Sequence, residues 1–115
     1  MDELKEAIRD NVDRIADRLI EVARDIHEHP ELKFAEHHAA NLLATELKEA
    51  GFAVELGVAG LETAIRAEHP AVSDGPTVAI LGEYDALPEL GHACGHNLIA
   101  AAGLGAALAV GAVKD

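Results

Sequence analysis

The apolar stretch near the end of the chain constrains the fold more than any other feature. Residues Leu98–Val113 carry no charged or strongly polar side chain, so a helix formed there is apolar around its whole circumference. The stretch is shorter than the roughly 20 apolar residues that a bilayer span needs. We therefore expect a buried helix. The remaining elements of a 115-residue chain can hardly cover such a helix on every side, which suggests part of a larger domain.

Two further helices are predicted by hydrophobic periodicity. Apolar residues recur at steps of three and four between charged ones over residues 2–28, which is typical of one long amphipathic helix. Pro30 ends it, because the residue before a proline is disfavoured in helical geometry. A second helix fits Ala35–Ala50, and Gly51 is placed to adopt the left-handed conformation that closes a helix.

Short β-type runs lie between these helices and the apolar stretch. Phe52–Leu56 and Thr63–Ala67 are expected to form a hairpin. His69–Pro76 is rich in turn residues and should be an exposed connection. Thr77–Leu81 is continuously apolar, as expected of a central strand covered on both faces. The order helix, helix, β-hairpin, central strand and buried helix predicts an α/β fold for residues 1–115, and the final helix suggests that this domain is incomplete.

Charge and cysteine content exclude several classes of partner. Nine Lys and Arg against 21 Asp and Glu give a formal charge of −12, which repels nucleic acid and anionic membranes. A single cysteine cannot form an internal disulfide, and the amino terminus lacks the apolar stretch of a secretion signal. We therefore expect a cytoplasmic protein that binds neither nucleic acid nor membrane.

The chemically richest segment follows the predicted central strand. Gly82–Pro88 and Gly91–Asn97 together contain two carboxylates, two imidazoles and a thiol. The carboxyl end of a strand is where open α/β sheets place their ligands. Thiolate and imidazole suit zinc and neighbouring transition metals, whereas magnesium and calcium prefer oxygen.

Cys94 and His96 are the candidate metal ligands. Their spacing would point them apart on a helix, so they can share an ion only in a looped backbone, and Gly95 supplies that freedom. Asn97 is expected to cap the apolar helix. A bound metal would lower the pKa of a water molecule and polarise a carbonyl, which is the chemistry of amide hydrolysis.

The other polar residues of the segment leave alternatives open. Asp85 either orients a metal ligand or caps a turn, and we favour the first role. Glu83 is balanced between a metal-site acid and a turn residue, and His92 is more simply a structural histidine. Ligands from one loop are too few for a catalytic centre, so others must come from elsewhere.

A second histidine-rich cluster spans His27–Leu32. A metal site is conceivable there, but at the end of a long helix before a proline we favour a turn whose His and Glu side chains bond free carbonyls and amides. His37 and His38, near the start of the second helix, are expected to be solvated surface residues.

Two strings of residues resemble a known family. These are "HEHPELKFAE" and, more specifically, "GEYDALPELGHACGHNLIAAAG". They resemble the amino-terminal part of the aminoacylase and carboxypeptidase family of zinc metallopeptidases, closest to the amidohydrolase and dipeptidase-like branch with a "HACGH" loop. The resemblance runs from about Ile26 to Val110.

The resemblance implies an α/β catalytic domain interrupted by a lid domain that often mediates dimers, with a site for two divalent ions, zinc or alternatively manganese. On that pattern Cys94 and His96 match the two metal ligands of the loop, and Asp85 matches the acid that supports the site. Glu83 stands where many relatives carry a His ligand, and no ligand role is transferred to it. The paired glutamates that supply the family's general base and a ligand, its later His ligands and its lid are absent from these residues.

The resemblance thus implies the opening part of a metal-dependent amidohydrolase acting on N-acyl amino acids or dipeptides, inactive by itself. Two alternatives remain open. One is a thiol enzyme or redox module with Cys94 as nucleophile and His92 or His96 as its base. The other is a noncatalytic remnant that associates with a partner through the apolar final helix.

Overall fold

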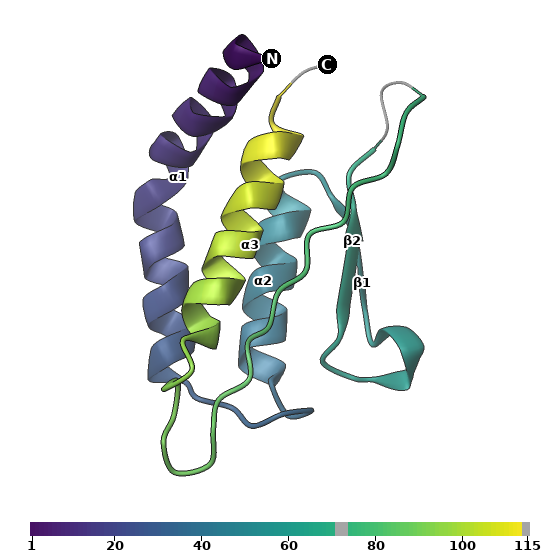
Figure 1. Cartoon of the computed structure of the whole chain (residues 1–115). Helices are drawn as coiled ribbons and strands as arrows, with labels where there is room; N and C mark the ends of the chain where they lie inside the picture. Colours follow the sequence, from purple (N-terminus) through teal and green to yellow (C-terminus); the bar gives the residue numbers. More distant parts are fainter. Residues whose placement is uncertain (71–73, 114–115) are drawn as a thin grey trace.

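The computed structural model describes residues 1–70 and 74–113, which form three helices and a β-hairpin (Figure 1). Helix α1 runs down the molecule in Figure 1, and α2 and α3 run back up beside it, so the described ends of the chain lie near one another. The hairpin lies beyond α2 and the three helices form the main layer. The elements are α1 (Asp2–Glu28), α2 (His37–Glu49), β1 (Ala53–Leu56), a 3-10 turn (Val58–Gly60), β2 (Ile65–Glu68) and α3 (His96–Gly111).

The predicted first helix is confirmed over its full length. Helix α1 ends at Glu28, directly before His29 and Pro30. Its fully buried side chains, Val22 and Ile26, lie in its last two turns. The core therefore sits at the carboxyl end of α1, while its amino-terminal half extends beyond it.

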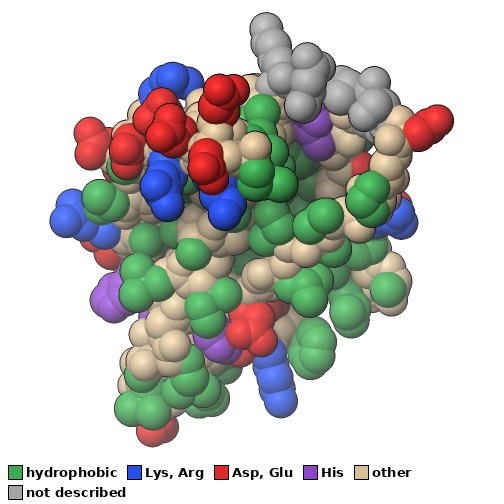
Figure 2. All heavy atoms as spheres, turned by 45° about the horizontal axis from the view of Figure 1, so that its top comes forward, with side chains coloured by type: hydrophobic (Ala, Val, Ile, Leu, Met, Phe, Trp, Pro, Cys, Tyr) green, Lys and Arg blue, Asp and Glu red, His purple; other side chains and the backbone are tan. Residues whose placement is uncertain are grey.

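The buried helix near the end of the chain is confirmed as a helix but is covered on one face only. Helix α3 buries Ala100, Ala101, Leu104 and Ala109 against its neighbours. Leu98 is 63% exposed and Val110 is 51% exposed. As expected, the described elements do not cover this helix on every side, because none of them lies over that outer face. Hydrophobic side chains are accordingly spread over much of the surface in Figure 2, whereas many acidic and basic ones gather at the upper left.

Helices α1 and α3 approach each other closely at a glycine. A Cβ atom added at Gly105 would lie 2.5 Å from Cδ1 of Leu19, which real contacts do not allow without a shift. Side-chain hydrogen bonds cross the same interface toward its two ends. Asn11 Nδ2 donates to the Ala109 carbonyl at 2.9 Å, and Asn97 Nδ2 donates to the Ala23 carbonyl at 3.1 Å. Because close packing and directional bonds act together, this interface has one fixed register.

An ion pair joins α1 to α2. Arg18 Nε donates to Glu46 Oε1 at 2.6 Å and Arg18 Nη2 donates to Glu46 Oε2 at 3.0 Å, the bidentate geometry that favours arginine. The Glu46 side chain is 8% exposed and that of Arg18 is 48% exposed. Hydrogen bonding to Glu46, and then to Glu21, raises the pKa of the Arg18 guanidinium further above its ordinary value. The charge of the buried Glu46 carboxylate is therefore balanced by Arg18, which lies at the edge of the core.

The second helix and the hairpin form close to their predicted places. Helix α2 starts two residues later than predicted, and Gly51 adopts φ +93°, the left-handed conformation expected after a helix. Strands β1 and β2 pair antiparallel, with Ala53 opposite Glu68 and Leu56 opposite Ile65.

The predicted central strand at Thr77–Leu81 is wrong for the described structure. These residues form an extended connection without strand pairing, and Val78 and Leu81 are 83% and 89% exposed. A strand needs a partner for its backbone N–H and C=O groups, and the described residues offer none beside this segment. The strands of the described chain are therefore those of the hairpin, β1 and β2.

The connection predicted at His69–Pro76 lies partly outside the described residues. Its described members, His69, Pro70 and 74–76, are exposed, as expected. No helix in the described part of the chain is both long and apolar enough to cross a membrane.

Candidate functional site

A backbone hydrogen bond joins the loop that precedes α3 to the turn between α1 and α2. The amide of Ala86 donates to the Glu31 carbonyl at 2.7 Å, so this part of the loop runs beside the turn after α1. The amides and carbonyls of Leu87 and Gly91 bond each other at 2.9 and 3.1 Å, which closes a tight turn between them. The loop therefore returns on itself and delivers residues 92–96 to the start of α3.

Tyr84 anchors the loop to the hairpin side of the molecule. Its hydroxyl donates to the Thr63 carbonyl, and the Thr63 hydroxyl donates to Glu36 Oε1 at 2.9 Å. Burial, reinforced by the nearby Glu36 carboxylate, raises the pKa of Tyr84 to about 12. The phenol thus stays protonated and holds the neighbouring acids Glu83 and Asp85 in place.

His96, the first residue of α3, lies between these two acids. Its Nδ1 is 2.8 Å from Asp85 Oδ1 and 3.0 Å from the Asp85 carbonyl, and its Nε2 is 3.3 Å from Glu83 Oε2. An ionised carboxylate and a carbonyl only accept hydrogen bonds, so Nδ1 carries a proton. This leaves Nε2 as the position from which neutral His96 can bind a cation.

The structure places Asp85 and His96 within hydrogen-bond distance of each other, and Cys94 lies outside this pair. Cys94 is exposed in the turn two residues before His96. Gly95 between them adopts φ +76°, so the backbone bend expected at this glycine is confirmed. The metal-ligand roles of Cys94 and His96 and the supporting role of Asp85 stay predictions.

Asn97 does not cap α3, so that expectation is wrong. The helix is preceded by Gly95 at its amino-terminal end, and the Asn97 side chain instead points to α1, where it bonds the Ala23 carbonyl. A residue inside the first turn can turn its side chain away from the free amides. The amide of Asn97 is 7% exposed and serves packing between helices.

His92 is buried beneath the loop. Neither of its ring nitrogens has a hydrogen-bond partner within the described part of the chain, and its ring centroid lies 6.3 Å from that of His27. Burial is the main cause that lowers the pKa of His92, followed by the charges of His27 and His96. Burial therefore disfavours the charged form of this ring.

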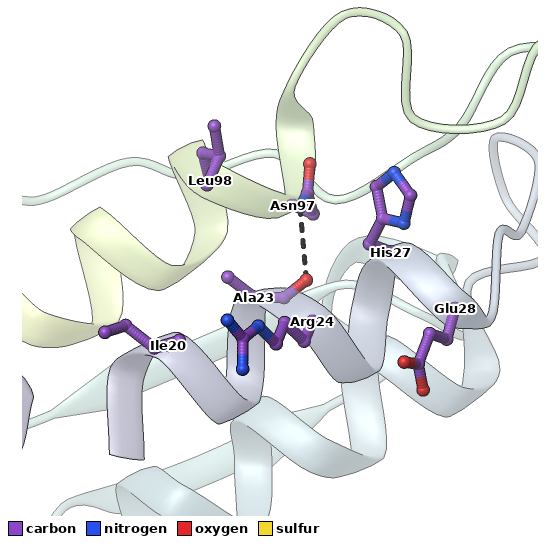
Figure 3. A pocket seen from close by; sticks show the side chains of 7 residues that line it. All are labelled: Ile20, Ala23, Arg24, His27, Glu28, Asn97 and Leu98. Carbon is purple, nitrogen blue, oxygen red and sulfur yellow. Dashed lines mark hydrogen bonds between the residues drawn. The ribbon is translucent and has the colours of Figure 1, made fainter. Parts of the chain in front are cut away.

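A groove of about 300 Å³ lies between the last turns of α1 and the first turn of α3 (Figure 3). Ile20, Ala23 and Leu98 give it an apolar floor and side. The dashed bond in Figure 3 links Asn97 to the backbone of Ala23, and His27 stands at the end of the groove near Glu28. The groove and the His96 site share the start of α3 but have different lining residues.

The His27–Leu32 cluster behaves as the predicted turn. His29 Nδ1 bonds the Asp25 carbonyl at 2.8 Å, which raises the pKa of His29. The Glu31 carboxylate accepts from the amides of His38 and Ala39 at 2.8 and 2.9 Å, so it satisfies free amides at the start of α2.

One group of side chains was missed by sequence reasoning. His38, expected to be a solvated surface residue, lies with Asp25 and His29 at the junction of α1 and α2. The spacing of Asp25 and His29, one helical turn apart, was the available signal. The position of His38 depends on the turn between the helices, which the spacing alone does not reveal.

We expect the unfolding free energy of the metal-free chain to depend on pH through His96. The hydrogen bond to Asp85 is the main cause that raises the pKa of His96. A raised folded-state pKa stabilises the protein fully below the unfolded value, and this stabilisation is lost as pH rises through the folded value. Asp85→Asn should therefore destabilise the chain more at about pH 5 than at about pH 8, on either side of the ordinary histidine value.

Urea unfolding with a chelator present, together with NMR titration of the imidazole, measures both effects. The His96 pKa should fall in Asp85→Asn and stay unchanged in Glu89→Gln, which alters an exposed acid of the same loop. An unchanged His96 pKa in Asp85→Asn would contradict the hydrogen bond.

Comparison with known proteins relates nearly the whole chain to a set of hydrolases. No family model matches it. The chain is 45% identical to a Xaa-Arg dipeptidase of Mus musculus over 97% of its own length. It is 35% identical over 98% to thermostable carboxypeptidase 1 of Saccharolobus solfataricus, and 35% identical over 96% to one of the subunits of the p-aminobenzoyl-glutamate hydrolase of Escherichia coli.

The chain spans only part of each relative. It covers 28% of the dipeptidase, 32% of the carboxypeptidase and 26% of the hydrolase subunit. The resemblance expected from the "HACGH" loop is thus confirmed by relatives whose names are those of dipeptidases, carboxypeptidases and amide hydrolases. Over nearly its whole length the chain is therefore similar to dipeptidases, carboxypeptidases and amide hydrolases, of each of which it covers less than a third.

Proposed function

We propose that the chain is the amino-terminal catalytic segment of a metal-dependent amidohydrolase that cleaves the amide bond of N-acyl amino acids or dipeptides. The observation that carries this proposal is the fixed orientation of His96 between Asp85 and Glu83 at the start of α3. The substrate class comes from the relatives, whose names include a dipeptidase and a p-aminobenzoyl-glutamate hydrolase.

The donors of this site fit a transition metal such as zinc, with manganese as the alternative. Cys94 offers an exposed thiol, His96 offers Nε2, and Glu83 offers an exposed carboxylate beside that nitrogen. Nitrogen and sulfur donors are those that zinc prefers. A bound metal of this kind polarises the substrate carbonyl and lowers the pKa of a water molecule.

Asp85 has the role of a positioning residue in this proposal. By accepting from Nδ1, its carboxylate fixes the His96 tautomer that leaves Nε2 free for a metal. The Tyr84 anchor and the turn closed by Leu87 and Gly91 hold the carboxylate in that position. The free backbone amides of the first turn of α3 lie at the same end of the helix as His96, and they favour an anionic group there.

We propose that residues in a further part of a longer protein complete the catalytic centre. The chain covers less than a third of the dipeptidase, the carboxypeptidase and the hydrolase subunit. The exposed Thr77–Leu81 segment and the outer face of α3 would be covered by additional sheet and helices. General base, remaining ligands and any dimer-forming lid would come from that part. The cytoplasm is its proposed location.

The proposal predicts that the chain needs the remainder of such an enzyme for activity. Purified chain with zinc or manganese should not hydrolyse N-acyl amino acids or dipeptides. A chimera in which the chain replaces the matching stretch of the mouse dipeptidase should hydrolyse the substrates of that dipeptidase. His96→Ala in the chimera should lower kcat/KM by more than about 100-fold, because even residues that merely orient a metal ligand are worth 10- to 100-fold.

Glu89→Gln in the chimera is the matched control, since it alters an exposed acid of the same loop. Robust turnover by the chain alone would refute the claim of incompleteness. Full activity of a folded His96→Ala chimera would refute the metal-ligand role.

The thiol-enzyme alternative gains one observation, because Asp85 orients His96 as the third member of a Cys-His-Asp arrangement would. Chelation separates the two functions. Loss of the chimera's activity with a chelator and recovery with zinc favour the metal enzyme. Inactivation by a thiol-alkylating reagent, with no effect of chelation, favours Cys94 as nucleophile.

A further inference from the structure

A compact group of potential metal ligands lies at the junction between α1 and α2, outside the His96 site. Asp25 and His29 are one turn apart at the end of α1, and His38 is the second residue of α2. His29 Nδ1 lies 3.0 Å and His38 Nε2 lies 2.8 Å from the same oxygen, Asp25 Oδ1. The three ligand atoms all lie within 4.8 Å of one another.

The two imidazole rings are held side by side. Their centroids are 4.2 Å apart and their planes differ by 25°, so one nitrogen of each ring converges on Asp25. The side chains of Asp25, His29 and His38 are 35%, 52% and 41% exposed. An ion can therefore reach the cluster from solvent and keep water molecules as further ligands.

The cluster is held by hydrogen bonds among its own ligand atoms, by the bond of His29 Nδ1 to the Asp25 carbonyl at 2.8 Å, and by contacts of the backbone around it. The Glu31 carboxylate fixes the backbone of His38 through the amides of His38 and Ala39. Asp25 lies in the last turn of α1, and His29 is the first residue after the helix, where its amide bonds the Ile26 carbonyl. Glu31, and not Asp25, His29 or His38, therefore satisfies the free amides at the start of α2.

Two imidazoles and one carboxylate suit zinc, cobalt(II) or nickel(II) better than calcium or magnesium. With metal–ligand bonds of about 2.0–2.1 Å, neighbouring ligands of a tetrahedral zinc ion are about 3.3 Å apart. The observed separations from Asp25, 2.8 and 3.0 Å, are hydrogen-bond distances only slightly shorter than that. A small opening of the cluster, with each ring proton moved to its other nitrogen, accommodates the ion, which then replaces the bond of His29 Nδ1 to the Asp25 carbonyl.

From this geometry we propose a second divalent transition-metal site, formed by Asp25, His29 and His38, with zinc as the ion that best fits its donors. The site is structural, since it links the end of α1 to the start of α2 across the turn that contains Pro30. The formal charge of −12 favours cation binding in general, and the converging ligands give the binding a defined location.

Zinc titration of the full 115-residue chain by calorimetry tests the site. Asp25→Asn and His38→Gln should each remove this binding event or weaken it by at least about tenfold, which corresponds to the loss of one favourable contact. His37→Gln, which changes the neighbouring exposed histidine, should leave it intact. A Cys94→Ser/His96→Gln double variant should retain it as well, which separates the junction from the candidate catalytic site.

Two spectroscopic readouts complete the test. Zinc should shift the imidazole ¹⁵N signals of His29 and His38, and it should raise Tm in the wild type but not in folded Asp25→Asn. Cobalt(II) at the junction should lack the thiolate charge-transfer band expected of a site that contains Cys94. Unmoved His29 and His38 signals at saturating zinc, or wild-type zinc affinity in Asp25→Asn, would overturn the proposal. If His38→Gln fails to fold, Asp25→Asn and His29→Gln provide the same comparison.

Discussion

Replacing Ile26 by Ala is expected to lower the free energy of unfolding by about 2–5 kcal/mol, the range for removing a large buried aliphatic side chain. Ile26 is fully buried in the cluster where α1 meets α2 and α3. Its loss removes hydrophobic burial and leaves a cavity that the neighbouring helices fill only partly. Because a domain of this size is stable by only about 5–15 kcal/mol, the variant should unfold at a much lower urea concentration.

Ile20→Ala provides a matched control for this result. It removes the same atoms from the same helix, but Ile20 is 49% exposed. Its cost should therefore be clearly smaller than that of Ile26→Ala. Urea unfolding followed by circular dichroism measures both, and equal costs would contradict the assignment of the core to the last turns of α1.

Replacing Arg18 by Met should lower the free energy of unfolding by about 1–3 kcal/mol. Methionine retains an apolar stem but removes both hydrogen bonds to Glu46, whose carboxylate is then left buried without its partner. The cost comes mainly from this uncompensated charge. Arg14→Met is the control, because Arg14 is exposed and its Nη1 donates to the neutral Asn11 side chain instead of a buried carboxylate.

A double variant separates the ion pair from the cost of breaking it. Arg18→Met/Glu46→Leu removes the orphaned carboxylate together with its partner, so most of the lost stability should return. Double-mutant-cycle analysis of urea unfolding gives the coupling energy between the two positions. A double variant whose cost equals the sum of the two single changes would show that the residues act independently.

Local patterns predicted the helices and the hairpin well. The bounds of α1 follow from apolar periodicity and Pro30, because both act within the helix itself. The strand at Thr77–Leu81 failed for the opposite reason. Its apolar residues indicate a site between covering layers, but a strand exists only where another strand accepts its hydrogen bonds, and the described residues provide none there.

The residues of the candidate site come from the sequence, and their roles stay predictions. The residue types and Gly95 indicated this loop, whereas the bond of His96 to Asp85 depends on how the loop folds back. The Asp25–His29–His38 group was missed because it joins two helices through a turn whose path the sequence pattern leaves open. Residue order indicates which side chains can bind or react, but it does not show which of them lie close together in the folded chain.

The close approach at Gly105 also affects how the sequence can change over evolutionary time. A Cβ atom at this position forces the Leu19 side chain to shift, so a substitution there is expected to cost less when a smaller residue already stands at position 19. The order of the two changes matters, because the smaller residue at position 19 merely opens a gap, whereas the larger residue at position 105 displaces its neighbour. The two positions, distant in sequence, are therefore expected to be epistatic, with the change at position 19 easier to accept first.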